Sequence, residues 1–132
     1  MPISAHAQPF GDTVYPVSYS FDEYNRMTNM TTYRNGIGWS GETWPTNTGT
    51  GDTTVWLYDE ATGLLTNKLY SDGNGTAYSY TSDGKLETRN WARGISTTYS
   101  YTNTTGEMVG IDYSDSTPDI TFTFDRLGRR TQ

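Results

Sequence analysis

Cysteine is absent from this sequence, and histidine occurs once, as His6. The absence of cysteine excludes a disulfide scaffold. Because the single histidine lies in an irregular N-terminal segment, we expect neither a histidine-based triad nor a metal site with several histidine ligands. The sequence also contains no Gly-x-Ser-x-Gly nucleophile elbow and no phosphate-binding Gly-x-x-x-x-Gly-Lys-Ser/Thr run. We therefore expect a protein that is not an enzyme, with no catalytic residues, no cofactor and no metal site.

Basic residues and long apolar runs are also scarce. Nine Lys and Arg residues stand against fifteen Asp and Glu residues, for a net charge of −6, which disfavours nucleic acid as a partner. No apolar run approaches the length of a membrane-spanning helix, and residues 1–6 lack the basic and apolar regions of a signal peptide. Hydrophobic residues make up only 33% of the chain, which suits a thin sheet with one solvated face.

What the sequence does contain is one pattern repeated five times, in which two aromatic residues flank a single polar or apolar residue. The second aromatic residues follow one another at intervals of 37, 22, 21 and 23 positions. Such a period is typical of a repeat architecture, and residues two apart in a strand share a face. We expect a structural aromatic ladder formed by Tyr19, Phe21, Trp56, Tyr58, Tyr78, Tyr80, Tyr99, Tyr101, Phe122 and Phe124. An exposed platform for carbohydrate is the alternative.

A residue that tolerates a positive φ angle follows each pair, four or five positions after the second ring. These structural turn residues are Asn25, Gly63, Gly84, Gly106 and Gly128. Glycine or asparagine at the end of a short polar segment is typical of a β-hairpin loop. The sequence therefore predicts five hairpins, with looser connections between them at residues 71–75 and 93–94.

The segments around these turns resemble the tyrosine–aspartate consensus of the RHS/YD repeats. That consensus is an aromatic residue, Asp, two or three variable residues, Gly, a basic residue, an apolar residue and Thr. Residues 58–66 and 124–131 follow it, residues 21–28 carry Asn in place of Gly, and residues 80–86 and 101–108 carry Thr in place of Asp. The resemblance covers roughly residues 17–34 and 53–132.

In the RHS/YD family the repeats build a long β-ribbon that spirals into a hollow shell, as in bacterial toxins and teneurins. The resemblance implies an all-β fold: a repetitive antiparallel meander of hairpins, about ten strands in one twisted, curved sheet. It also implies a structural scaffold role in a bacterial protein outside the cell or at its surface. Toxin-class members carry a self-cleaving Asp-Pro-x-Gly segment, but this chain has no Asp-Pro dipeptide, so that activity is not implied.

The domain organisation follows from the phase of the repeats. We expect residues 1–16 to be an N-terminal segment that could donate a strand, and residues 17–132 to be the repeat domain. The array stops within its fifth hairpin, so the chain is either an excerpt or completed by a strand from elsewhere. Because an open sheet edge is a template for another strand, the expected partners are copies of itself or the rest of a parent RHS protein. A filament subunit assembled by strand addition is an alternative function.

One segment, residues 35–52, interrupts the period as a Gly- and Thr-rich loop insertion that contains Trp39 and Trp44. Loops of this length are often functional, and flat aromatic faces on a polar loop can stack on sugar rings. Both tryptophans are therefore candidate contacts of a carbohydrate-binding surface module, with glycans as partners. The other interpretation is that they fold back over the edge of the aromatic ladder.

Three acids lie close together near the C-terminal end: Asp112, Asp115 and Asp119. Calcium accepts such oxygen ligands, but the regular spacing of a calcium loop is missing. We expect these carboxylates to be solvated turn residues.

Overall fold

The computed structural model describes residues 8–10, 13–37 and 44–131 of the chain. All regular elements among them are β-strands: β1 Gln8–Phe10, β2 Thr13–Tyr15, β3 Val17–Phe21, β4 Met27–Arg34, β5 Thr50–Tyr58, β6 Leu65–Leu69, β7 Gly75–Tyr80, β8 Leu86–Asn90, β9 Ser96–Tyr101, β10 Met108–Tyr113 and β11 Ile120–Thr121. The all-β prediction is confirmed. No helix in the described ranges could span a membrane.

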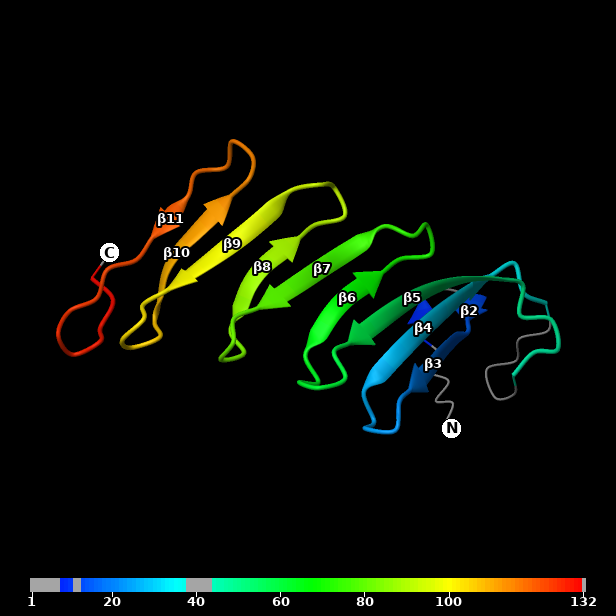
Figure 1. Ribbon diagram of the computed structural model, residues 1–132. Coiled ribbons are helices and arrows are strands. Elements are labelled where there is room, and N and C mark those ends of the chain that lie inside the picture. Colours follow the sequence, from blue (N-terminus) through cyan, green and yellow to red (C-terminus); the bar gives the residue numbers. More distant parts are fainter. Residues whose placement is uncertain (1–7, 11–12, 38–43, 132) are drawn as a thin grey trace. The chain divides into compact units, whose positions relative to one another are not determined.

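The strands follow one another in the sheet as they do in the sequence (Figure 1). Strands β3 to β11 form one nine-stranded sheet in which each strand is hydrogen bonded to its sequence neighbours, and β1 pairs with β2 in a separate two-stranded sheet. The pairings are antiparallel. This order confirms the predicted meander of hairpins.

The chain divides into two compact units, one made of residues 1–57 and 67–74 and the other of residues 58–66 and 75–132. In the first unit β4 pairs with both β3 and β5. In the second unit β7, β8, β9, β10 and β11 pair in that order. The predicted division between residues 1–16 and 17–132 stays a prediction.

The connections between hairpins are tighter than expected. Gly73 donates its backbone N–H to the carbonyl of Tyr70 at 3.0 Å, and Gly94 donates to that of Trp91 at 2.9 Å. Both glycines have positive φ angles, 81° and 83°. This is the pattern of a three-residue hairpin loop that ends in a left-handed residue. The expectation of looser connections was wrong, because these links use the same turn as the hairpins themselves.

The inserted loop extends the β4–β5 hairpin. Arg34 lies opposite Thr50, and an isolated bridge joins Ile37 to Asn47. Strand β5 begins at Thr50, so the last three positions of the predicted insertion belong to a strand. Gly49 has a φ of 77°, and a Cβ there would lie 2.1 Å from the carbonyl oxygen of Arg34. Only glycine fits this position.

The described residues enclose no hydrophobic core. None of their aliphatic or aromatic hydrophobic side chains is buried, and the buried polar ones are Thr76 and Thr97, 6% and 2% exposed. In such a sheet each strand is stabilised mainly by the strands beside it, as in other repeat proteins.

Candidate functional site

The five repeat turns all place their expected residue in the left-handed region. The φ angle is 62° at Asn25, 82° at Gly84, and 73° at Gly63, Gly106 and Gly128. The backbone hydrogen bonds show that the loop is one residue longer in the second and fourth turns. The offset of four or five positions in the sequence is therefore the difference between two loop lengths.

An aspartate holds the first and fifth turns. Asp22 Oδ1 accepts backbone N–H bonds from Tyr24 and Arg26, at 3.0 and 2.9 Å, and its Oδ2 pairs with Arg26 Nε at 2.6 Å. In the fifth turn Asp125 repeats these contacts and pairs with Arg129 Nε at 2.7 Å. Desolvation raises the pKa of Asp22, but the hydrogen bonds and charge of Arg26 outweigh it and lower the pKa below its usual value.

In the third turn a threonine, Thr81, replaces the aspartate, and an acid, Asp83, lies two positions further along the chain. Thr81 Oγ1 accepts the backbone N–H of Lys85 at 3.0 Å, as the aspartate oxygen does in the first turn. Asp83 forms an ion pair with Lys85. The hydrogen bond from the Lys85 ammonium, together with one from the Thr81 hydroxyl, lowers the pKa of Asp83 to about 2.

The fourth turn keeps the threonine but has no ion pair. Thr102 Oγ1 accepts the backbone N–H of Glu107 at 3.1 Å and shares a hydrogen bond of 2.6 Å with the Thr105 hydroxyl. The Thr105 hydroxyl also donates to the Glu107 carboxylate. We call the second aromatic residue of each pair the anchor ring. The position after the anchor ring therefore requires an oxygen that accepts a turn N–H bond, and a charge there is optional.

Two tyrosine hydroxyls tie successive repeats together. Tyr80 donates its hydroxyl to the carbonyl of Leu65 at 2.8 Å, and Tyr101 donates to the carbonyl of Leu86 at 2.7 Å. Each acceptor lies two residues after the turn glycine of the preceding repeat. Burial raises the pKa of each of these tyrosine hydroxyls above the usual value.

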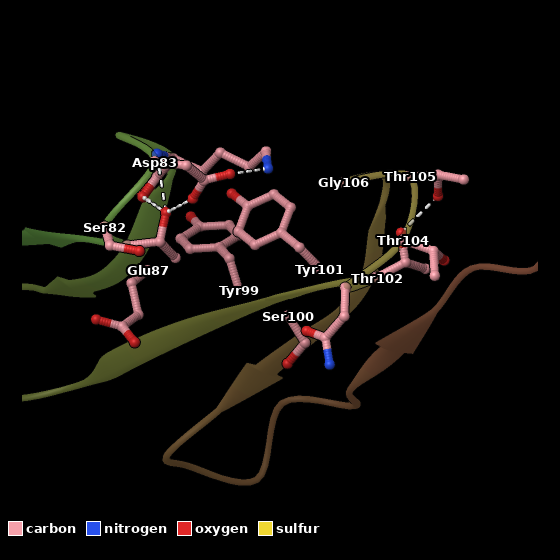
Figure 2. Close-up of a pocket in the computed structure, with 13 residues that line it drawn as sticks. Ser82, Asp83, Glu87, Tyr99, Ser100, Tyr101, Thr102, Thr104, Thr105 and Gly106 are labelled. Atoms are coloured by element: carbon pink, nitrogen blue, oxygen red, sulfur yellow. Dashed lines mark hydrogen bonds and ion pairs between the residues drawn. The ribbon is translucent and has the colours of Figure 1, made fainter.

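Open grooves lie between the turns of neighbouring repeats in the second unit. The groove between the third and fourth turns has a volume of about 700 Å³, and the one between the second and third turns about 670 Å³. Figure 2 shows Tyr99 and Tyr101 side by side in the first of these, next to Asp83. Lys85 Nζ lies 5.5 Å from the ring centre of Tyr101, so this groove already holds its own cation.

The ladder rings share one face within each unit. Residues directly opposed in an antiparallel pair project to the same side. In the second unit Tyr78 lies opposite Arg89, and Tyr99 lies opposite Ile111. In the first unit Tyr19 lies opposite Met30. We call this side of each unit the aromatic face.

The other side of each unit carries hydroxyl groups. Cross-strand hydroxyl pairs join Thr31 to Thr53 at 2.8 Å in the first unit and Ser79 to Thr88 at 2.7 Å in the second. We call this side the hydroxyl face. In the second unit it also carries Asp112, which lies opposite Thr98, and Glu87, whose carboxylate accepts a hydrogen bond from Ser79.

Basic side chains on the aromatic face were missed by the sequence analysis. Lys68 Nζ lies 5.4 Å from the ring centre of Trp56 and 5.3 Å from that of Tyr70. Arg130 lies opposite Phe124 and stacks on Phe122 at 4.9 Å.

The third repeat has the tightest of these contacts. The guanidinium carbon of Arg89 lies 3.5 Å from the ring centre of Trp91 and 5.9 Å from that of Tyr78. The available signal was a basic residue two positions before an aromatic residue, which occurs at residues 68–70 and again 21 positions later at residues 89–91.

The structure describes only one of the two tryptophans of the inserted loop. Trp39 lies outside the described residues. Trp44 is 41% exposed, and its ring meets Tyr33 edge to face at 5.7 Å. Tyr33 bonds to Ser18 at 3.2 Å on the hydroxyl face, so this contact of Trp44 is not with a ladder ring. Carbohydrate binding by Trp44 stays a prediction.

Two of the three acids near the C-terminal end make local turn contacts, whereas Asp112 lies within strand β10, so its expected place in a turn was wrong. Asp115 Oδ1 accepts the backbone N–H of Thr117 at 3.0 Å, and Asp119 Oδ1 accepts that of Tyr113 at 2.9 Å. Hydrogen bonds from Thr117 lower the pKa of Asp115, with a smaller contribution from the charge of Arg93. Within the described ranges no group of three His, Cys, Asp or Glu side chains could hold a metal ion.

Comparison with known proteins gives a structural match. No family model and no curated protein matches the chain. The crystal structure of TcdB2-TccC3, an RHS/YD-repeat toxin, superposes with a TM-score of 0.65 at 18% identity, over 91% of this chain and 6% of that chain. The structure titled TcdB2-TccC3-Cdc42 gives 0.64 at 19% identity, over 91% and 5%.

A third structure, of TcdB2-TccC3 without its hypervariable C-terminal region, gives a TM-score of 0.64 at 18% identity, over 91% of this chain and 5% of that one. The chain therefore spans only a small part of each protein that it matches. These likenesses confirm, at the level of the fold, the resemblance inferred from the turns: the chain has the antiparallel β-repeat fold of an RHS/YD-repeat toxin.

Proposed function

We propose that this chain is a structural segment of a larger β-repeat scaffold, with the rest of an RHS protein or further copies of itself as its partner. The tyrosine bonds between successive repeats carry the proposal. Tyr80 and Tyr101 each bind a backbone carbonyl of the repeat before them, while no described hydrophobic side chain is buried. Such a chain is stabilised repeat by repeat, which suits a wall that continues into neighbouring repeats.

Removal of one complete repeat tests the scaffold role. Deleting residues 81–101 joins Tyr80 directly to Thr102, so the shortened chain still reads in phase. We expect it to fold, with far-ultraviolet circular dichroism typical of β-sheet and a cooperative urea transition. Deleting residues 81–90 removes one turn and one strand, reverses the direction of every later strand, and should prevent folding. Equal damage by both deletions would contradict a repeat scaffold.

The scaffold role implies that the chain has no catalytic activity of its own, and that it works at the cell surface or outside the cell. Peptide, ester and glycan substrates should remain intact when incubated with the chain. Turnover that disappears on changing a single acidic residue would overturn this part of the proposal.

Assembly into filaments by strand addition is a second candidate. The supporting observation is that β3 and β11 are the outermost strands of the nine-stranded sheet. Ile120 in β11 is 40% exposed, and a lysine on an edge strand opposes pairing with another chain. We expect Ile120→Lys to abolish any concentration-dependent association seen by light scattering. Leu127→Lys, in a turn and at a residue that is 77% exposed, is the matched control.

The predicted donor segment can be tested in the same assay. Deletion of residues 1–16 should leave monomers if this segment supplies the added strand. In the structure β1 pairs with β2 within the segment, so donation requires that hairpin to open. Association that survives the deletion would exclude the segment as the donor.

Carbohydrate binding at the inserted loop is a third candidate, favoured by the exposed ring of Trp44. A sugar stacked on that ring should lose affinity in Trp44→Ala and keep most of it in Trp44→Phe. Binding to a panel of neutral glycans measures both variants, and no binding by the unmodified chain would remove this candidate.

A further inference from the structure

Arg89 occupies an unusual position for a basic residue. It lies in β8, which pairs with β7 on one side and β9 on the other, opposite Tyr78 and Thr97. Its Nε is buried, and no described residue accepts a hydrogen bond from it. Trp91 covers the flat side of the guanidinium at 3.5 Å. The group is therefore fixed in place while part of its donor edge has no partner.

Four other basic residues of the chain are neutralised in the turns or at strand ends. Ion pairs join them to aspartates: Arg26 to Asp22, Arg34 to Asp52, Lys85 to Asp83 and Arg129 to Asp125.

Arg89 belongs to none of these pairs. A second guanidinium, that of Arg93, lies 5.8 Å from the same Trp91 ring, and no ion pair in the described ranges joins either arginine to a carboxylate. The strand acids Glu87 and Asp112 of this unit project to the hydroxyl face. Among the described residues, Asp115, in the turn after β10, is the one further carboxylate that feels the charge of Arg93. The surface around Trp91 therefore has two guanidinium groups against one nearby carboxylate, in a chain of net charge −6.

We propose that Tyr78, Arg89, Trp91 and Arg93 form a binding site for the carboxylate of an acidic saccharide, a hexuronate. A guanidinium stacked on a ring keeps its in-plane N–H donors free for bidentate binding of a carboxylate. The partly buried Tyr78 ring beside it offers a flat surface to the sugar ring. This role is separate from the scaffold function, and either can fail without the other.

An extended peptide fits this position less well than a saccharide. Peptides that bind to sheets usually add a strand at an open edge. Both edges of β8 are already hydrogen bonded, to β7 and to β9. A ligand at Arg89 therefore meets side chains alone, and needs its own rigid surface to lie on the rings.

Calorimetric titration of the full chain with α-1,4-linked tetragalacturonate tests the site, with neutral maltotetraose as the comparison ligand. We expect the hexuronate to bind at least about tenfold more tightly than the neutral sugar, because charge-assisted hydrogen bonds are worth at least that factor. Arg89→Gln should weaken hexuronate binding by about tenfold or more. Arg126→Gln removes the same charge from an exposed turn and should leave the affinity unchanged.

Three outcomes would overturn the proposal: no binding of tetragalacturonate, an equal loss of affinity in Arg89→Gln and Arg126→Gln, or equally tight binding of tetraglutamate, which would assign the site to acidic peptides. If Arg89→Gln does not fold, the unmodified chain still gives an answer. Its Arg89 Nε–H resonance, assigned by its loss in Arg89→Lys, should shift on adding hexuronate and not on adding maltotetraose. An unmoved resonance would refute the site.

Discussion

The third and fourth repeats are held differently from the first and fifth. In the third and fourth, the anchor ring is a tyrosine that bonds to the preceding repeat, and the turn is capped by a threonine. In the first and fifth, the anchor ring is Phe21 or Phe124, which has no hydroxyl, and an Asp–Arg pair closes the turn. Tyrosine hydroxyls therefore connect the third and fourth repeats to the repeat before them, whereas the Asp–Arg pairs of the first and fifth repeats act within one turn.

The second repeat carries both residues of the YD consensus. It combines Tyr58 with Asp59, whose Oδ1 accepts hydrogen bonds of 2.7 Å from both the backbone N–H and the hydroxyl of Thr62. No basic residue follows its turn glycine, where Leu64 stands. The third and fourth repeats have the tyrosine link without an aspartate after the ring, and the first and fifth have the aspartate without a tyrosine. The two residues of the YD consensus therefore act independently, one between repeats and one within a turn.

The largest loss of stability is expected from changes at the turn glycines, and it should be the same in both kinds of repeat. Gly84→Val and Gly128→Val should each lower the free energy of unfolding by about 1–3 kcal/mol, because valine is strained at positive φ. At Gly84 a Cβ would meet nothing within 4 Å, so the loss is conformational. Urea denaturation measures it. Gly110→Ala, where the added Cβ would lie 3.5 Å from Ser100 Cβ, is the control, and equal losses at Gly84 and Gly110 would contradict the strain argument.

The tyrosine link should give the next largest effect. Tyr101→Phe and Tyr80→Phe each remove a hydroxyl that bonds to a carbonyl of the preceding repeat, at a cost of about 0.5–1.5 kcal/mol. Tyr24→Phe, in a residue that is 70% exposed, should cost nearly nothing. Thermal and urea unfolding of the three variants would measure these losses of stability. Losses no larger than that of Tyr24→Phe would mean that the hydroxyls do not connect the repeats.

Acid should weaken the fifth turn through its aspartate. Backbone and side-chain hydrogen bonds from Arg129 lower the pKa of Asp125 below its unfolded value of 3.8. A lowered folded pKa stabilises the fold at pH values above 3.8, and this contribution disappears as the pH falls through the folded pKa. The stability difference between the unmodified chain and Asp125→Asn should therefore shrink on acidification. A difference that stays constant below pH 3.8 would contradict this assignment.

The smallest effect is expected from exchanging one cap for the other. Thr81→Asp combined with Asp83→Ser places the acid where the first and fifth turns have it, four residues before Lys85. Because both arrangements satisfy the same backbone N–H and pair the same ammonium, the urea midpoint should hardly change. Thr81→Ala is the reference, since it leaves that N–H without its acceptor. A double variant as unstable as Thr81→Ala would show that the two caps are not equivalent.

Much of the fold was predictable because it depends on local chemistry. Alternating rings and a glycine or asparagine at a constant offset predict strands and hairpin loops without knowledge of any distant residue. The tight turns at Gly73 and Gly94 were also visible as glycines, but Ser71 and Ala92 stand where the consensus has an aspartate directly after the aromatic residue. These turns were therefore predicted to be looser links.

The period, the positions of the five repeat turns and the antiparallel order of the strands could be read from the sequence, since each depends on residues close together in the chain. Which distant groups meet depends on the tertiary structure. The bond from Tyr101 to Leu86 spans 15 residues, and the opposition of Arg89 to Thr97 depends on the register between β8 and β9. Register is a property of two strands together, because a shift by one residue moves every side chain to the other face. The contact between Arg89 and Tyr78 was therefore settled by strand pairing and not by composition.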